Sequence, residues 1–269
     1  MALLRPSCPG LRLRHRGSLA HLLRRRRRSD QRPRVHIHSP DPHDAAQLAA
    51  VAAAAAAARA APGGVICLCW HEVTVDRQPT PAPVWAGRGS TQPCAEPTPG
   101  PATPRRILAA LHRQTGQGVR ARADHVDVPP LVAFAQKLVA AYPPAERLYV
   151  VTDNLPVHFH PDLLVAFEAQ ETSFTPPLPP NWPTTPRPAA LRRGGTRQLP
   201  IQLVPLPTYA SWANPIEHLW RLLRQEVTHG HPFAADLAAL RTALATFCAR
   251  FAQPTPELLL TVGLGTSDT

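Results

Sequence analysis

Proline decides where this chain can form regular structure. The sequence has 34 prolines in 269 residues, and many of them are concentrated in two stretches, Gly87–Pro104 and Pro176–Pro200. Proline fixes φ and lacks the backbone N–H, so such stretches are excluded from helix interiors and from central strands. Regular structure is therefore expected between them. The hydrophobic share of 44% is enough for a core, and the length allows one large domain or a modest domain with tails.

Positive charge is concentrated at the N-terminus. The chain has a formal net charge of +11, but residues 1–40 hold 11 arginines and one acid, so the remainder is close to +1. This composition favours a disordered, self-repelling tail. A nucleic-acid arm that exchanges phosphate counterions and a transit peptide are the alternative interpretations. Residues 1–40 contain no helix-turn-helix pattern.

Cysteine usage and hydropathy argue against several classes of protein. The five cysteines are an odd number without a disulfide framework, which fits a reducing cytoplasm. Cys67 and Cys69 alternate within an apolar run, so they are expected on one face of a strand, and a zinc half-site there lacks a second pair of ligands. No apolar stretch approaches the length of about 20 residues that spans a bilayer, so no membrane partner is expected.

The order of predicted elements indicates the fold class. Helices are predicted for an alanine-rich segment and for four later segments, namely 41–64, 131–142, 162–170, 215–228 and 235–251. Strands are predicted for 65–70 with an extension to 75, and for 84–85, 105–111, 148–151 and 201–204. This is the order of an RNase H-like α/β domain, a mixed sheet flanked by helices with sites at strand ends. The predicted organisation is a disordered basic N-terminal tail at 1–40, a linker helix at 41–64 and this domain at 65–265.

Two acidic residues occupy positions that suit metal-dependent phosphodiester chemistry. Such chemistry uses two divalent ions about 4 Å apart, held by carboxylates from separate elements. Asp153 directly follows the strand 148–151, although Asp153-Asn154 is also typical of a turn. Glu217 lies on the first turn of a helix with Asn214 as its N-cap and Pro215 first, a rigid mount for a ligand, but glutamate there also completes a capping box. Spacing alone leaves these alternatives open.

Both acids lie in motifs of a known family. The stretch IQLVPLPTYASWANPIEHLW at 201–220 resembles the signature of IS630-type transposases, and VVTDNLPVH at 150–158 is similar to the family motif of the second acid. The resemblance extends over about 39–265 and includes Arg77-Gln78-Pro79 and Trp85-Ala86 with Gly89. It implies the endonuclease domain of the Tc1/mariner-like DDE superfamily. It also implies Asp153 and Glu217 as catalytic metal ligands, with Asn154 and His158 as supporting residues.

The position of the first acid departs from the family pattern. In the family, the first strand ends in an aspartate followed by a glutamate, whereas this chain has Cys69-Trp70-His71-Glu72. His71 therefore takes the place of the metal-binding aspartate and is counted with Asp153 and Glu217 as a metal residue. A neutral imidazole can bind a metal, but it prefers softer ions and supplies no negative charge to hold Mg²⁺. Glu72 is expected on the opposite face of the strand, and Asp76 lies five residues further on. Either is a candidate to replace the missing acid, and Glu72 is counted among the supporting residues.

The resemblance implies a transposase catalytic domain that cleaves DNA and transfers the strands of an insertion sequence with Mg²⁺ or Mn²⁺. The expected partners are DNA, as transposon ends and target, and a second copy of the chain in a homodimer. The expected location is the bacterial cytoplasm, at the nucleoid. Replacement of the first acid and the lack of helix-turn-helix modules favour an alternative, a catalytically dead DNA-binding or interaction remnant. A third hypothesis is an RNase H-like nuclease without transposition.

Overall fold

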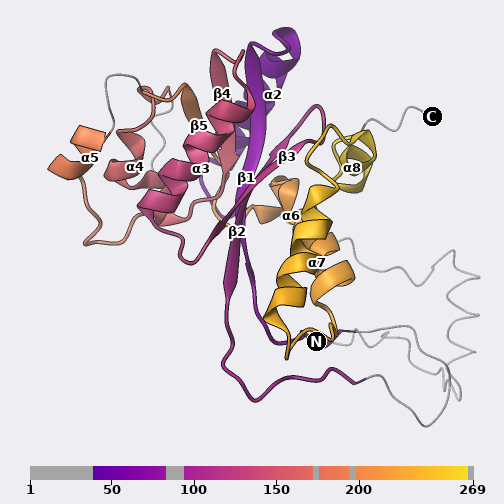
Figure 1. The fold of residues 1–269 in the computed structure, drawn as a ribbon. Coiled ribbons are helices and arrows are strands. Elements are labelled where there is room, and N and C mark those ends of the chain that lie inside the picture. The colour runs from indigo at the N-terminus through magenta and orange to yellow at the C-terminus, as the bar shows by residue number, and fades with distance from the viewer. Residues whose placement is uncertain (1–38, 83–93, 172–175, 194–197, 266–269) are drawn as a thin grey trace, which may run out of the picture. The chain divides into compact units, whose positions relative to one another are not determined.

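A sheet of five strands forms the centre of the computed structural model, which describes residues 39–82, 94–171, 176–193 and 198–265 (Figure 1). The strands are β1 (Val65–Val75), β2 (Arg105–His112), β3 (Gly118–Ala123), β4 (Arg147–Thr152) and β5 (Ile201–Pro205). Their order in the sheet is β3-β2-β1-β4-β5. β1 is antiparallel to β2, and β2 to β3, whereas β4 is parallel to both β1 and β5. The sheet is therefore mixed, as the sequence predicts.

Alternation along β1 builds a hydrophobic core on each face of the sheet. Cys67 and Cys69 lie in one cluster, whereas Leu68 and Trp70 lie in the other. Residues of α2 (Asp44–Ala60), α6 (Ile216–Leu223) and α7 (Leu237–Ala249) complete the first cluster. Residues of α3 (Val128–Ala141) and α4 (Pro161–Leu164) complete the second. Helices therefore cover both faces of the sheet, as Figure 1 shows for α3 and α4 on one side and α6 and α7 on the other.

Leu68 tests this placement of the core. It is fully buried in β1, so Leu68→Ala is expected to lower the free energy of unfolding by about 2–5 kcal/mol through lost burial and a residual cavity. Leu191→Ala is the matched control, because Leu191 on α5 (Pro188–Arg193) is 54% exposed and should contribute less than about 0.5 kcal/mol. Urea unfolding followed by circular dichroism measures both. Equal effects at the two positions would contradict the assignment of Leu68 to the core.

Helix α2 carries the alanine tract, which the sequence predicts as a linker helix. It packs Val51, Ala54 and Ala58 into the first cluster, so its apolar stripe lies against the sheet. Alanine has the highest helix propensity, which explains why this tract is helical despite its small side chains. None of the helices in the described ranges has the length and hydrophobicity that a membrane span needs.

The prediction of a helix at 162–170 is wrong beyond its first turn. α4 ends at Leu164, and Phe167 then forms an isolated bridge with Leu199, two residues before the edge strand β5 begins. Two glutamine side chains hold this segment, because Gln170 accepts a hydrogen bond from the Leu203 N–H and Gln202 accepts one from the Glu171 N–H. The segment thereby covers an edge of the sheet that would otherwise expose unpaired backbone groups.

Several smaller elements complete the described chain. The 3-10 turns η1 (Pro156–Phe159) and η2 (Ser211–Ala213) lie in the loops after β4 and β5. α6 continues as a π-helical turn, η3 (Arg224–Thr228), so the helix predicted for 215–228 is one helical segment with two geometries. Strand β3, the short helix α5 and helix α8 (Pro256–Thr261) are additional to the predicted elements. The predicted strand at 84–85 lies outside the described residues.

Candidate active site

The pairing of β1 with β4 brings His71 and Asp153 together. Cys69 pairs with Val151, and β1 then continues to Val75, while β4 ends at Thr152. His71 and Asp153 each lie two residues beyond this pair, at the carboxyl end of β4. Their side chains meet there, with 3.6 Å between Nε2 of His71 and Oδ2 of Asp153. The strand register therefore joins the first and second positions of the predicted site.

Helix α6 contributes the third residue, Glu217. A loop leads from β5 to the first turn of α6, where Oε1 of Glu217 lies 3.0 Å from Nε2 of His71. Because the carboxylates of Asp153 and Glu217 approach the same nitrogen atom, these oxygens lie within about 7 Å of each other. Two metal ions about 4 Å apart can be reached from carboxylates at that separation.

The start of α6 is fixed by Asn214 without a capping box. Asn214 is buried, and its side-chain amide donates a hydrogen bond to the carbonyl oxygen of Trp70 at 3.1 Å. No side-chain hydrogen bond caps this helix, and the Glu217 carboxylate contacts His71. The expectation of a side-chain N-cap at Asn214 is therefore wrong: its amide NH2 joins α6 to β1, its Oδ1 has no hydrogen-bond partner among the described residues, and the Glu217 N–H donates to the backbone oxygen of Asn214 instead.

Trp220 determines which nitrogen of His71 carries the proton. The indole Nε1 of Trp220 lies 3.0 Å from Nδ1 of His71, and an indole N–H can only donate. Nδ1 must therefore accept, and in a neutral imidazole the proton then resides on Nε2. The Nε2–H group donates to Glu217 and also faces Asp153. His71 thus offers a hydrogen-bond donor, and no lone pair, to the two carboxylates.

Opposing influences act on the charge of His71. Burial alone would lower its pKa, whereas the hydrogen bond to Glu217 and the charges of Glu217 and Asp153 raise the pKa above its ordinary value. Trp220 opposes protonation, because a charged imidazole has an N–H on both nitrogens and one of them would face the indole N–H. We assign the neutral Nε2–H form, in which no two donors face each other.

The side chain of His158 lies between those of Asp153 and Glu72 and contacts both. Its side chain is 2% exposed, with Nδ1 at 3.1 Å from Oδ1 of Asp153 and Nε2 at 3.1 Å from Oε1 of Glu72. Burial alone would lower the pKa of His158, but the charge of Glu72 and the hydrogen bond to Asp153 raise it to about 10. The imidazolium in turn lowers the pKa of Asp153, although burial alone would raise it. His158 therefore keeps Asp153 ionised.

Glu72 lies on the opposite face of β1 from His71, as the alternation predicts. Trp70 donates a hydrogen bond from Nε1 to Oε1 of Glu72 at 2.6 Å. Glu72, Asp153 and His158 offer ligand atoms within 4.8 Å of one another. Both nitrogens of His158 are engaged by the two acids, so the charged imidazole already acts as the cation of this group. The group fits a metal ion only after His158 loses its proton and moves.

Asn154 joins the two loops of the site. Its side-chain amide donates to the carbonyl oxygen of Leu206 at 2.8 Å and to Oγ1 of Thr208 at 3.4 Å. The loop after Asp153 is therefore tied to the loop that leads to Glu217. Asp76 makes no hydrogen bond or ion pair with the described residues around it and is exposed.

Two tryptophans of the site are additional to the predicted residues. Trp220 lies three residues after Glu217, a spacing that puts both on one side of a helix, and this was the signal available in the sequence. Trp70 directly precedes His71, on the opposite strand face. Cys67 and Cys69, which also lie in β1, do not belong to the site. They form no disulfide, are fully buried and are part of the first core cluster.

The fold and the site together define an RNase H-like domain. Its mixed sheet of five strands is flanked by helices, and its acidic residues come from a strand end and from a helix packed on that sheet. A family model described as DDE superfamily endonuclease matches residues 67–241. The chain therefore belongs to the DDE superfamily endonuclease family.

Solved structures of the Mos1 mariner transposase share this fold. The paired-end complex with Mn gives a TM-score of 0.51 at 12% identity, covering 92% of this chain and 66% of that one. The paired-end complex with the left transposon end gives 0.52 at 11% identity, with 92% and 66% covered. The strand transfer complex gives 0.50 at 12% identity, with 92% and 65% covered. This chain thus spans just under two thirds of the length of those three chains. A comparison with curated proteins found no match.

Proposed function

We propose that this chain is the catalytic domain of an IS630-type DNA transposase, which cleaves DNA and transfers strands with Mg²⁺ or Mn²⁺. The supporting observation is that Asp153 and Glu217, from separate elements, approach one nitrogen atom of His71. Membership of the DDE endonuclease family supports the reaction class. One Mos1 structure of the same fold is a paired-end complex with the left transposon end, which supports DNA as the partner. Two other Mos1 paired-end complexes are with Mn and with Mg, which supports these ions as cofactors.

Asp153 and Glu217 are the residues that would hold the metal. Both offer hard carboxylate oxygens, the ligands that Mg²⁺ prefers. A divalent ion bound there would stabilise the charge on the attacking and leaving oxygens of a phosphodiester. His158 supports this role by keeping Asp153 ionised, and Asn154 supports it by fixing the loop that leads to Glu217. Glu72 would support the metal site indirectly, through its ion pair with His158.

His71 is the residue that weakens this proposed metal site. Its Nε2–H group points between the two carboxylates, where a metal ion requires a lone pair. Metal binding through Nε2 requires the proton to move to Nδ1, which would then face the N–H donor of Trp220. We therefore propose that His71 becomes a ligand only when the Trp220 hydrogen bond is lost, and that the native chain binds Mg²⁺ weakly.

The same Nε2–H group favours a second candidate function. A chain whose first ligand position, His71, holds a hydrogen-bond donor can keep the fold and a DNA-binding surface without cutting DNA. This candidate is a DNA-binding or interaction domain that has lost catalysis. It differs from the first only in whether the native chain retains measurable cleavage.

Nicking of a supercoiled plasmid tests the proposed function. We expect slow Mn²⁺-dependent nicking by the native chain that stops when EDTA removes the metal. Asp153→Asn and Glu217→Gln should each reduce the rate at least about a hundredfold, since a catalytic metal contributes several kcal/mol of transition-state stabilisation. Glu146→Gln is the matched control, because Glu146 is an exposed acid that precedes β4 and makes no contact with the site.

Each outcome separates the candidates. Nicking by the native chain that disappears in Glu217→Gln supports an active transposase domain. No nicking by the native chain, together with Glu217-dependent nicking by His71→Asp, supports the domain that has lost catalysis. Nicking that is unchanged in both Asp153→Asn and Glu217→Gln overturns the assignment of this site.

A further inference from the structure

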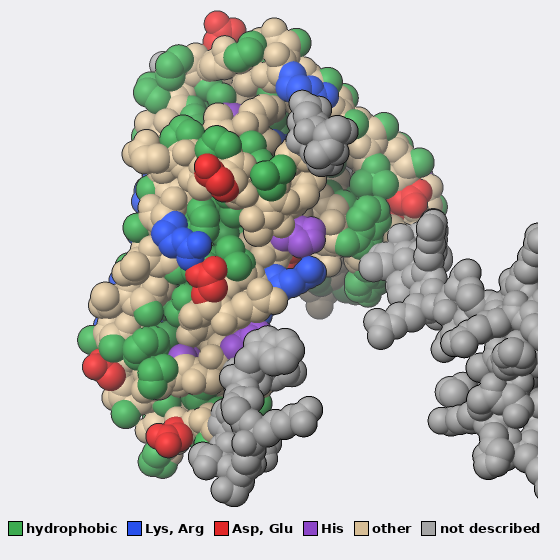
Figure 2. All heavy atoms as spheres, turned by 90° about the vertical axis from the view of Figure 1, so that its right-hand side faces the viewer, with side chains coloured by type: hydrophobic (Ala, Val, Ile, Leu, Met, Phe, Trp, Pro, Cys, Tyr) green, Lys and Arg blue, Asp and Glu red, His purple; other side chains and the backbone are tan. Residues whose placement is uncertain are grey.

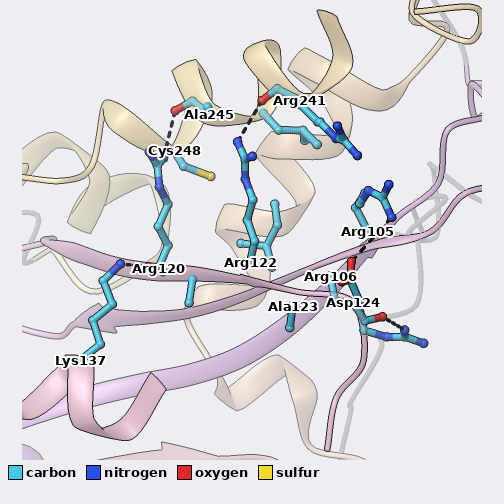
Figure 3. A pocket seen from close by; sticks show the side chains of 13 residues that line it. Arg105, Arg106, Arg120, Arg122, Ala123, Asp124, Lys137, Arg241, Ala245 and Cys248 are labelled. Atoms are coloured by element: carbon cyan, nitrogen blue, oxygen red, sulfur yellow. Dashed lines mark hydrogen bonds and ion pairs between the residues drawn. The ribbon is translucent and has the colours of Figure 1, made fainter. Parts of the chain in front are cut away.

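A pocket lined by cations lies between strand β3 and helix α7 (Figure 3). Its volume is about 640 Å³, and six of its lining residues are basic: Arg105, Arg106, Arg120, Arg122, Lys137 and Arg241. Figure 3 shows Arg120 and Arg122 extending from β3 toward α7, with Lys137 approaching from α3 on the other side of the strand. The pocket is separate from Asp153 and Glu217, which are not among its lining residues.

Little negative charge compensates these cations. Among the described residues, Asp124 is the one acid that lines the pocket, and its largely exposed side chain pairs with Arg105 at 3.7 Å. Four of the other cations donate to backbone carbonyl oxygens instead. These bonds run from Arg106 to Asp124 at 2.8 Å, from Arg120 to Ala245 at 3.0 Å, from Arg122 to Arg241 at 3.4 Å and from Lys137 to Arg120 at 2.6 Å. Neutral carbonyls hold the side chains in position but leave their charge uncancelled.

The sheet register puts the pocket next to the candidate active site. Ala109 of β2 pairs with His71 on one side and with Arg120 on the other. Side chains of directly paired residues project from the same face of a sheet, so Arg120 and His71 share a face. Two strand spacings of about 4.8 Å separate their backbones by roughly 10 Å. Phosphates follow one another every 3.4 Å or so along the axis of a DNA strand, so DNA held at His71 has further phosphates within reach of the pocket.

The concentration of charge at this pocket is local. Outside residues 1–40 the chain is close to neutral. On the face shown in Figure 2, the Lys, Arg, Asp and Glu side chains are scattered among hydrophobic, other side-chain and backbone atoms. The density of positive charge around this cavity is therefore higher than in the rest of the domain, and the six basic residues create a positive potential that attracts anions.

We propose that this pocket binds the phosphate backbone of duplex DNA beside the site of cleavage. A guanidinium group has five N–H donors, so the arginines that use one of them on a carbonyl keep others for phosphate oxygens. The inference rests on the proposed function, because the DNA that would enter the pocket is the segment that flanks the proposed cleavage site. DNA binding in the pocket requires no metal and no catalysis, so the pocket and the proposed function are tested separately.

Salt-dependent DNA binding tests the pocket. A fluorescent duplex of about three helical turns is titrated with the full chain at several NaCl concentrations, and anisotropy gives Kd. Each phosphate contact contributes about 0.9 to the slope of log K against log salt. We expect Arg120→Gln/Arg122→Gln to lower this slope by about two and to weaken binding at least tenfold near 0.1 M salt. Arg241→Gln, an exposed position with no hydrogen bond of its side chain to the described residues, should lower it by about one.

The control removes the same charge elsewhere. Arg59→Gln/Arg192→Gln changes two exposed arginines on α2 and α5, and it should leave the slope unchanged. Residues 1–40 are present in every variant, so their contribution cancels in the comparison. Thermal unfolding of each variant separates loss of binding from loss of folding, and Arg241→Gln tests the pocket even if the double variant unfolds.

Two results would overturn the inference. The first is a slope in Arg120→Gln/Arg122→Gln and in Arg241→Gln that equals the slope of the control. The second is tighter binding of an RNA duplex of equal length, which would assign the pocket to another nucleic acid. If the slope falls as expected while nicking is independent of Asp153 and Glu217, the proposed function fails and the DNA-binding pocket stands. If nicking depends on both acids and the slope is unchanged, the pocket alone is rejected.

Discussion

Replacing His71 by aspartate is expected to tighten divalent-metal binding by roughly a hundredfold or more and to raise DNA nicking in parallel. The substitution exchanges a neutral Nε2–H donor for a carboxylate between Asp153 and Glu217. A unit charge pair at 4 Å contributes about 4 kcal/mol at an effective dielectric constant of 20, and the ion carries two charges. Isothermal titration with Mn²⁺ and Mg²⁺ measures the affinity, and plasmid nicking measures the rate.

Two further variants distinguish the effect of the added negative charge from the effect of the smaller side chain. His71→Asn has the size of aspartate without its charge, so we expect it to bind metal no better than about tenfold more tightly than the native chain. His71→Asp/Glu217→Gln should lose most of the gain of the single variant, because one of the three carboxylates is again missing. An equal gain in the asparagine variant would show that the imidazole merely blocks the site. A full gain without Glu217 would remove Glu217 from the proposed ligands.

Replacing His158 by leucine is expected to lower the free energy of unfolding by about 3–5 kcal/mol, because it removes the counter-charge of the largely buried Glu72 side chain. The side chain of Glu72 is 8% exposed and that of His158 is 2% exposed. Without the imidazolium, Glu72 keeps the hydrogen bond from Trp70 but loses its counter-charge, and Asp153 loses the group that lowers its pKa. Urea unfolding at neutral pH, followed by tryptophan fluorescence, measures the loss.

A double-mutant cycle identifies the cause of that loss. In Glu72→Gln/His158→Leu no unpaired charge is left at position 72, so we expect the double variant to be less destabilised than the sum of the two single variants. His125→Leu is the control for the exchange of histidine for leucine, because His125 is exposed in the loop between β3 and α3 and should change stability by less than about 0.5 kcal/mol. Simple additivity of Glu72→Gln and His158→Leu would exclude the ion pair as the source of stability.

The strands and acids that were predicted from the sequence all lie in short stretches whose residue pattern is itself informative. Leu148–Val151 and Ile201–Val204 are short runs of apolar residues bounded by polar or proline-rich segments, and both are strands in the structure. Period-two alternation along β1 also predicted that His71 and Glu72 face opposite sides. The motifs around Asp153 and Glu217 identified the two acids, and the structure brings both to His71.

Other features depend on distances between residues that are remote in sequence. Val119 is the one buried residue of strand β3, and the partly buried Ala121 and Ala123 have small side chains, so the alternation of this strand gives a weak apolar signal. His158 and Glu72 are 86 positions apart, and no local pattern relates them. The proton position on His71 follows from a contact with Trp220 that arises only when α6 packs on β1. The sequence therefore predicted acids that lie together in the structure, whereas the contacts of Trp70 and Trp220 and the proton position on His71 required the packed structure.

The hydrogen bond from Trp220 has a consequence for the history of position 71. An indole N–H can donate to a carboxylate oxygen as readily as to an imidazole nitrogen, so the surroundings of His71 accept either side chain. Histidine and aspartate codons differ only in their first base. A single nucleotide change is therefore sufficient to exchange the two residues, and the packing of α6 on β1 presents no barrier to it in either direction.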